Sequence, residues 1–229
     1  ISHQENLPQE ISDINIVILL KKEITSSDTV LPLFGISDNT FKTFNDRPNL
    51  LTKREIRIQL LADLELPELG TILDIGSGSG TIGLEALRLR PKLKLISIDK
   101  RFGSEFLVRE NAKKLGVSPK NIIESDVRKF LTNDLNHSFS DSNRVVIGGC
   151  DNETKIYIIE FLSKFLKKAD IIVLPIITYE VLQKVSNCLK QFNYETSINL
   201  IQTFKGLSIS EGTRFEPNNP VFIVKAKKK

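Results

Sequence analysis

At 229 residues with 40% hydrophobic side chains, the chain has the length and composition of an ordinary globular protein with one sizeable core and one main domain. Its 32 lysines and arginines exceed its 28 aspartates and glutamates, and the resulting charge of +4 favours an anionic partner without identifying it. Two cysteines and two histidines are too few for a disulfide framework or a zinc site, and a reducing, cytoplasmic setting fits best. No apolar run approaches the roughly 20 residues that span a bilayer.

The first thirty residues contain one strand-like run, Asn15–Leu20, followed by a charged and polar stretch from Lys21 to Thr29. A single strand is not stable without a partner, and the linker-like composition after it favours a strand of another domain over an edge strand of the main sheet. The chain begins with Ile1 and contains no methionine, which suggests an excerpt of a longer protein. We therefore predict an upstream remnant plus linker over residues 1–33 and the main domain over residues 34–229.

The first predicted helix follows a stretch rich in Gly, Asp, Asn and Pro. Thr52 and Glu55 have the spacing of a capping box, in which a hydroxyl and a carboxylate satisfy the first free amides of a helix. Apolar residues then recur with helical spacing at Ile56, Leu60, Leu61 and Leu64. The pattern predicts a helix that ends before Pro67.

Short apolar strands then alternate with helical segments. The predicted strands are 72–75, 93–98, 122–124, 145–147 and 171–174, and the predicted helices are 81–88, 104–115, 153–166 and 180–192. This alternation is typical of a parallel sheet with helices on both faces. The stretches 194–204 and 221–224 are again strand-like and predict a terminal antiparallel hairpin, whereas a nicotinamide-binding domain normally ends in a sixth parallel strand.

The motif that carries chemistry is a glycine loop, Asp-Ile-Gly-Ser-Gly-Ser-Gly, which begins at Asp74 where the first strand of the main sheet turns into a helix. Its glycines also satisfy the dinucleotide pattern G-x-G-x-x-G, and a tight turn without any ligand is a further alternative. Asp74, two residues before the first glycine, and the terminal hairpin favour S-adenosylmethionine. We predict a Rossmann-like class I methyltransferase fold with a seven-stranded, mostly parallel sheet, and cofactor contacts from Gly76, Ser77, Gly78, Ser79 and Gly80.

Further candidate cofactor residues end the next strands of the predicted sheet. Asp99 ends the second strand, where a carboxylate can accept the two ribose hydroxyl protons of either adenosylmethionine or NAD. Asp126 follows the third strand, where its side chain and the amide of Val127 can reach an adenine ring, although aspartates are also common in plain turns. Gly148 and Gly149 follow the fourth strand and either leave space beside the reactive methyl group or form a simple turn.

Four stretches together carry a likeness to known proteins: Phe44–Arg57, the glycine loop, Val146–Gly149 and Asn219–Ile223. They resemble one family, the decarboxylating precorrin-6B (cobalt-precorrin-6B) C(15)-methyltransferases of cobalamin biosynthesis, and the likeness runs from about Leu33 to Val224. The run Thr-Lys-Arg-Glu-Ile-Arg that begins at Thr52 is its most specific element. The resemblance implies cofactor contacts at Thr52, Gly76–Gly80, Asp99 and Val127, and it suggests a homo-oligomer. Residues 11–20 look like the end of a fused C(5)-methyltransferase domain.

The implied substrate is a tetrapyrrole with many carboxylates that is methylated at C(15) while the C(12) acetate loses carbon dioxide. The candidate substrate residues are basic side chains and the two glycines after the fourth strand: Arg47, Lys53, Arg54, Arg57, Lys100, Arg101, Gly148 and Gly149. Asp151, Glu153 and Tyr179 are candidate proton donors. The sequence departs from the family at Cys150–Asn152 and at Lys205–Ser208, both on the expected substrate side.

Two other function classes remain open from the sequence. The basic C-terminal tail is compatible with a class I methyltransferase acting on RNA or another small molecule, although 13 phenylalanines against 3 tyrosines and no tryptophan speak against an RNA-binding surface. A noncatalytic nucleotide-binding domain that retains only the fold is the second alternative.

Overall fold

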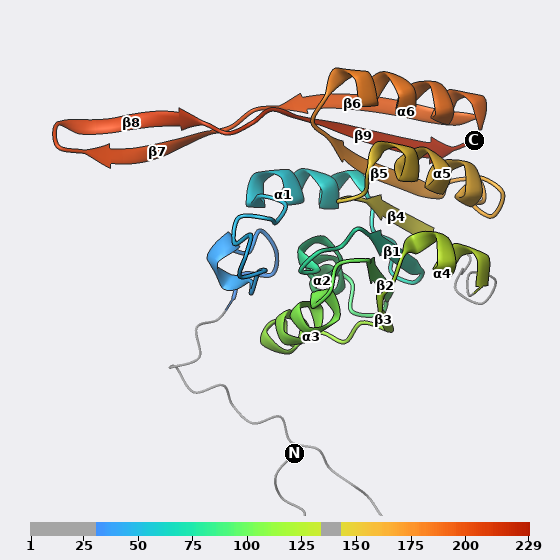
Figure 1. The fold of residues 1–229 in the computed structure, drawn as a ribbon, viewed down its shortest axis with the longest axis horizontal. Helices are drawn as coiled ribbons and strands as arrows, with labels where there is room; N and C mark the ends of the chain where they lie inside the picture. The colour runs from blue at the N-terminus through green and yellow to red at the C-terminus, as the bar shows by residue number, and fades with distance from the viewer. Residues whose placement is uncertain (1–30, 134–142) are drawn as a thin grey trace, which may run out of the picture. The chain divides into compact units, whose positions relative to one another are not determined.

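The computed structural model describes residues 31–133 and 143–229 (Figure 1). Residues 1–30 form a separate unit from Leu31–Lys229, so the fold below is that of the second unit. The predicted strand Asn15–Leu20 and its linker lie outside the described residues, and their assignment to an upstream domain stays a prediction. No helix within the described residues is long and apolar enough to cross a membrane.

A seven-stranded sheet forms the centre of the unit, in the order β3-β2-β1-β4-β5-β9-β6. The strands are β1 (Thr71–Ile75), β2 (Lys94–Asp99), β3 (Asn121–Glu124), β4 (Asn143–Ile147), β5 (Ile171–Ile176), β6 (Tyr194–Ile201) and β9 (Val221–Lys228). The first five run parallel, and β9 lies antiparallel between β5 and β6. The predicted fold class is confirmed, because a mostly parallel sheet ends in an antiparallel pair.

Helices cover both faces of this sheet (Figure 1). They are α1 (Arg54–Asp63), α2 (Thr81–Leu89), α3 (Ser104–Leu115), α4 (Val127–Asn133), α5 (Asn152–Leu162) and α6 (Tyr179–Gln191). Successive strand residues point to opposite faces, so Ile72 packs with the core of α1 to α3 and Leu73 with the core of α4 to α6. All five residues of β1 are buried, as expected for a central parallel strand.

The local predictions are confirmed where the hydrophobic period is long. Helix α3 has the predicted bounds, and the other predicted helices are found within a few residues except that α5 ends at Leu162 instead of Leu166. The seven-residue α4 and the 3-10 turn η1 (Asp38–Thr40) were not predicted, because such short segments carry little periodicity.

The predicted capping box is wrong. Helix α1 begins at Arg54 with Lys53 at the N-cap, and no side chain caps it. Thr52 lies one residue too early for the capping position, and its carbonyl oxygen accepts a hydrogen bond from Arg57 Nη1 at 2.6 Å. Thr52 therefore contributes its carbonyl to a buried arginine and not its hydroxyl to the helix start.

A second, two-stranded sheet extends the predicted terminal hairpin. Strands β7 (Phe204–Ile209) and β8 (Gly212–Pro217) pair only with each other among the described strands, and they continue beyond β6 and β9 (Figure 1). The sequence predicted the strands at 194–204 and 221–224 but not a separate hairpin between them. Its side chains are almost all exposed, including Phe204 at 58% and Phe215 at 67%.

Candidate cofactor site

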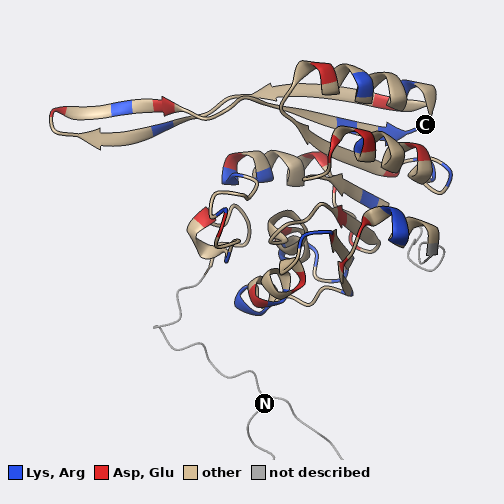
Figure 2. Ribbon diagram, viewed as in Figure 1, with Lys and Arg blue, Asp and Glu red and all other residues tan. Residues whose placement is uncertain are grey.

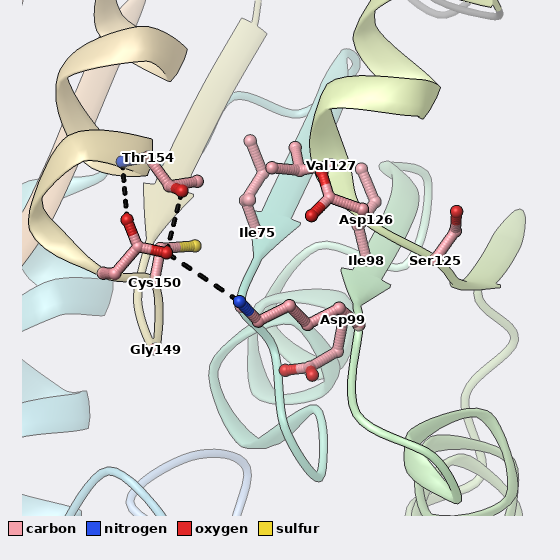
Figure 3. Close-up of a pocket in the computed structure, with 12 residues that line it drawn as sticks. Ile75, Ile98, Asp99, Ser125, Asp126, Val127, Gly149, Cys150 and Thr154 are labelled. Atoms are coloured by element: carbon pink, nitrogen blue, oxygen red, sulfur yellow. Dashed lines mark hydrogen bonds and ion pairs between the residues drawn. The ribbon is translucent and has the colours of Figure 1, made fainter.

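A pocket lies at the carboxyl edge of the parallel strands β1 to β4 (Figure 3). This is the edge at which open α/β sheets bind ligands. Its lining residues come from the ends of these strands and the segments that follow them: Ile75, Gly76, Ile98, Asp99, Lys100, Ser125, Asp126, Val127, Gly149, Cys150, Asp151 and Thr154. The pocket therefore collects residues from four segments that are far apart in the chain.

The glycine loop contributes Gly76 to the pocket and is hydrogen-bonded to the end of β2 and to the segment that follows β4. The amides of Gly76 and Ser77 donate to the carbonyl of Ile98 at 2.8 and 3.2 Å, and the amide of Gly149 donates to the carbonyl of Gly76 at 3.2 Å. Gly76 has a φ of +70°, and a Cβ there would lie 2.6 Å from the nitrogen of Gly149. Only glycine permits both this backbone conformation and this close approach.

Asp99 connects the glycine loop to the end of β2. Its Oδ2 accepts from the Gly78 amide at 2.7 Å, and its Oδ1 accepts from the Arg101 amide at 2.8 Å. The carboxylate remains partly exposed in the pocket. Each carboxylate oxygen has a second lone pair, so the group can still accept from a pair of ribose hydroxyls.

The sequence predicted Asp74 as a feature of the S-adenosylmethionine site, but the structure places it outside the pocket. The side chain is 1% exposed and packs between β1 and α2, where its Oδ2 accepts from the Gly83 amide at 3.0 Å. Burial raises the pKa of this carboxyl to about 7. Asp74 therefore links the strand to the helix behind the glycine loop and is absent from the pocket lining.

The rest of the pocket wall is formed by the segments that begin α4, next to Asp99, and α5. Asp126 Oδ1 accepts from the Arg128 amide, and Asp151 caps α5 by accepting from the Thr154 amide and hydroxyl, all at 2.8 Å. The bond from the Thr154 amide lowers the pKa of Asp151, whereas burial raises the pKa of Cys150 to about 11. Near neutral pH the wall thus presents ionised Asp151 beside a neutral thiol.

The charge of the pocket favours a cationic ligand. Of its twelve lining residues, three are aspartates and only Lys100 is basic, with its Nζ 3.8 Å from Asp151 Oδ2. Carboxylates at this density attract the positive sulfonium and amino groups of adenosylmethionine and repel the pyrophosphate of a dinucleotide. The charge of the pocket therefore favours S-adenosylmethionine over a dinucleotide, a choice that the glycine spacing and Asp99 alone had left open.

The structure brings together part of the predicted cofactor set. Gly76, Asp99, Asp126 and Val127 line the pocket, as do the predicted substrate residues Lys100 and Gly149. The remaining glycine-loop residues are adjacent to it in the chain. Sequence reasoning missed Ile75, Ile98, Ser125 and Thr154 as pocket residues, whereas it had placed Cys150 and Asp151 on the expected substrate side. The available signal was the position of these residues in or after the carboxyl ends of predicted parallel strands, except for Thr154, which lies inside α5.

Arg57 requires a correction, because it was predicted to pair with substrate carboxylates. The side chain is fully buried, and its Nε and Nη1 form ion pairs with Glu85 at 2.8 Å and with Asp38 at 2.6 Å. Its other hydrogen bonds go to the carbonyls of Ile36 and Thr52. With its donors used inside the protein, Arg57 holds residues 36–52 against α1 and α2 and cannot reach a ligand.

The other predicted basic residues have partners or remain exposed. Arg54 Nε donates to the Gly35 carbonyl at 2.6 Å, and Arg101 pairs with Asp46 at 2.5 Å. Arg47 is exposed and Lys53 is half-buried. Their contacts with a substrate stay a prediction, as does a cofactor contact from Thr52.

Residues 43–228 match the family described as precorrin methyltransferase domain. The chain belongs to this family. The predicted resemblance and the predicted class, an S-adenosylmethionine-dependent methyltransferase, are thereby confirmed. The matched region does not reach the upstream segment, so the fused C(5)-methyltransferase domain stays a prediction.

This precorrin methyltransferase domain has curated relatives in several archaea. It is 31% identical over 195 residues to a probable cobalt-precorrin-6B C(15)-methyltransferase (decarboxylating) of Sulfurisphaera tokodaii. The alignment covers 85% of this chain and 97% of that protein. A protein of the same name from Pyrobaculum aerophilum is 30% identical and covers 84% and 95% of the two chains.

The fold of this domain also matches solved structures. A precorrin-6y C5,15-methyltransferase from Geobacter metallireducens GS-15 superposes with a TM-score of 0.75 at 28% identity, over 87% of this chain and 100% of that one. The precorrin 8W decarboxylase of Methanobacterium thermoautotrophicum superposes with a TM-score of 0.72 over 83% and 98% of the chains, at 21% identity. The second likeness concerns the fold alone.

Proposed function

We propose that this domain methylates C(15) of a precorrin with S-adenosylmethionine and promotes loss of the C(12) acetate carboxyl as carbon dioxide, in cobalamin biosynthesis. The observation that carries the proposal is the acidic pocket around Gly76 and Asp99 in a chain that aligns with 97% of a curated relative of that name. Membership of the precorrin family disfavours the RNA and noncatalytic alternatives, because neither accounts for the whole matched region.

The residues of the pocket fit S-adenosylmethionine. The loop Gly76–Gly80 offers backbone that a ligand can approach closely, since a Cβ at Gly78 would meet only open space. Asp99 would accept from the ribose hydroxyls, and Asp126 with the Val127 amide would hold the adenine. When bound, the cofactor supplies a methyl group on a positively charged sulfur.

The chain's own contribution to the reaction is orientation, exclusion of water and placement of charge. Positioning alone can supply a large part of the acceleration in an in-line displacement. We assign pairing with substrate carboxylates to Arg47, Lys53, Arg54, Lys100 and Arg101. Arg and Lys are the side chains that suit such anionic groups.

Decarboxylation requires one proton at the acetate carbon. The bonds from Thr154 lower the pKa of Asp151, and this makes Asp151 the least suitable of the candidate donors. Glu153 and Tyr179 remain candidates by their position after strand ends. A donor must lie within hydrogen-bonding reach of the acetate carbon in the complex.

The test is incubation of the protein with precorrin-6B or cobalt-precorrin-6B and methyl-labelled S-adenosylmethionine. We expect a mass gain of one methyl group together with release of one carbon dioxide per substrate. The variant Asp99→Ala serves as the control that loses cofactor binding, with affinity measured by calorimetry. Methylation without carbon dioxide release, or binding of NAD in place of S-adenosylmethionine, would refute the assignment. The comparison of the two substrates shows whether cobalt is required.

We further propose that the domain forms a homo-oligomer through the β7–β8 hairpin. The register places Phe204 opposite Pro217 and Phe215 opposite Gly206, so both phenylalanines lie on one face of the hairpin. The other face carries the charged residues Lys205, Arg214 and Glu216 together with Leu207 and Ile209. Isolated two-stranded hairpins are at best marginally stable in water. A second copy of the chain that covers the phenylalanine face would stabilise the hairpin.

The double variant Phe204→Ser/Phe215→Ser should therefore be monomeric, with a mass near 25.8 kDa in light scattering after gel filtration, while the unmodified chain has a multiple of that mass. Lys205→Ser, on the opposite face of the same hairpin, is the matched control and should leave the oligomer intact. A monomeric unmodified chain, or an unaffected double variant, would contradict the proposal.

The cytoplasmic location predicted from the sequence is also part of the proposal. Cys150 and Cys188 are both free thiols among the described residues, as expected in a reducing compartment.

A further inference from the structure

Asn111, on α3, connects the glycine loop to a segment that is remote in sequence. Its side chain is 1% exposed. The Oδ1 accepts from the Lys42 amide at 2.7 Å, and the Nδ2 donates to the carbonyls of Lys42 at 3.0 Å and Ser79 at 2.9 Å. One buried amide thus bridges the loop at Ser79 and the segment Phe41–Arg47, which we call the bridge segment.

The same segment has a second connection to the cofactor site through Arg101. The Arg101 amide donates to Asp99 Oδ1, and its guanidinium pairs with Asp46 Oδ2 at 2.5 Å and lies over the ring of Phe44, 4.1 Å from the ring centroid. Phe44 is 7% exposed. The bridge segment is therefore attached both to the glycine loop and to the residue expected to bind ribose.

These contacts leave little freedom to Ser79. The neighbouring Gly78 amide is bonded to Asp99, and the Ser79 carbonyl is bonded to Asn111, so the loop is held from β2 on one side and from α3 on the other. A buried polar group that loses its partner carries a large desolvation cost. Removing the Asn111 amide would affect both the loop and the bridge segment, since they share it.

We propose that Asn111 is a positioning residue that couples the glycine loop to the bridge segment, so that ligand binding in the pocket is transmitted to a segment that contributes none of the described pocket-lining residues. The bridge segment ends at Arg47, one of the basic residues assigned to the substrate, but the coupling involves only a ligand in the cofactor pocket and the bridge segment. The coupling can therefore be tested without the tetrapyrrole, and failure of this test is distinguishable from failure of the proposed function.

The probe is S-adenosylhomocysteine, with affinity measured by calorimetry and protection of the bridge segment by hydrogen exchange. In the unmodified chain we expect the ligand to increase protection of the bridge segment as well as of residues 74–80. In Asn111→Ala we expect affinity to fall about tenfold or more, as for loss of buried hydrogen bonds. At saturating ligand the variant should still protect residues 74–80 but no longer the bridge segment.

Two further variants separate positioning from general stability. Asn111→Asp keeps the side-chain volume and an acceptor for the Lys42 amide but lacks the amide donors, so it should also lose the coupling. It replaces Asn111→Ala as the test variant if Asn111→Ala does not fold. Asn143→Ala removes another fully buried amide, bonded to Asp170 away from the pocket lining, and should lower stability with affinity changed less than twofold. Unchanged affinity in both Asn111 variants, or a bridge segment that does not respond to ligand in the unmodified chain, would overturn the proposal.

Discussion

Replacing Arg57 by methionine is expected to lower the free energy of unfolding by about 3–5 kcal/mol, the usual effect of breaking a buried ion pair. The side chains of Arg57 and Glu85 are both fully buried, so methionine would leave the Glu85 carboxylate with the two backbone amides of Gly35 and Ile36 but without its countercharge. For a domain of this size the melting temperature should fall by on the order of 10 °C, measured by circular dichroism.

Two controls show whether the loss comes from the unpaired charge. The double variant Arg57→Met/Glu85→Gln should recover part of the stability, because the remaining buried group is neutral. Lys92→Met, which breaks the exposed pair with Glu68, should change stability by less than about 1 kcal/mol. If Arg57→Met kept its melting temperature and instead raised KM for the tetrapyrrole, the sequence-based substrate role would be right and the structural role wrong.

The second large effect is expected for Gly76→Ala, which should lose S-adenosylmethionine binding. A Cβ at this position would meet the Gly149 nitrogen at 2.6 Å, and a backbone atom cannot move away as the end of a flexible side chain can. Overpacking costs about 1–3 kcal/mol, and the left-handed backbone at φ +70° adds about 1–2 kcal/mol. Because Gly76 and Gly149 both line the pocket, we expect calorimetry to show an affinity decrease of at least about tenfold.

Gly116→Ala is the matched control for backbone strain. Gly116 has a φ of +66° at the end of α3, and a Cβ there would meet nothing within 4 Å. The variant should therefore lose about 1 kcal/mol of stability and retain its affinity for the cofactor. If Gly76→Ala and Gly116→Ala bound the cofactor equally well, the close contact between Gly76 and Gly149 would not be needed for cofactor binding.

Much of the fold and half of the site follow from patterns that are local in the sequence. Helix α3 could be predicted because its apolar residues repeat with helical spacing over 12 residues, and strands β1 to β5 because their short apolar runs alternate with helical segments. Gly76 and Asp99 could be predicted as pocket residues because parallel strands bring their carboxyl ends to one edge, whatever the details of packing.

The sequence by itself thus determined the alternation of β1 to β5 with the longer helices, the sheet class and the place of the glycine loop, but not α4 or the β7–β8 hairpin. Only the tertiary structure decided which polar residues face the ligand and which face the core. Arg57 and Asp74 have the chemistry of ligand-binding groups, yet Glu85 and Gly83 are their partners. The physical reason is that the local sequence specifies which residues are polar, whereas their partners come from distant segments that crossover connections bring into contact.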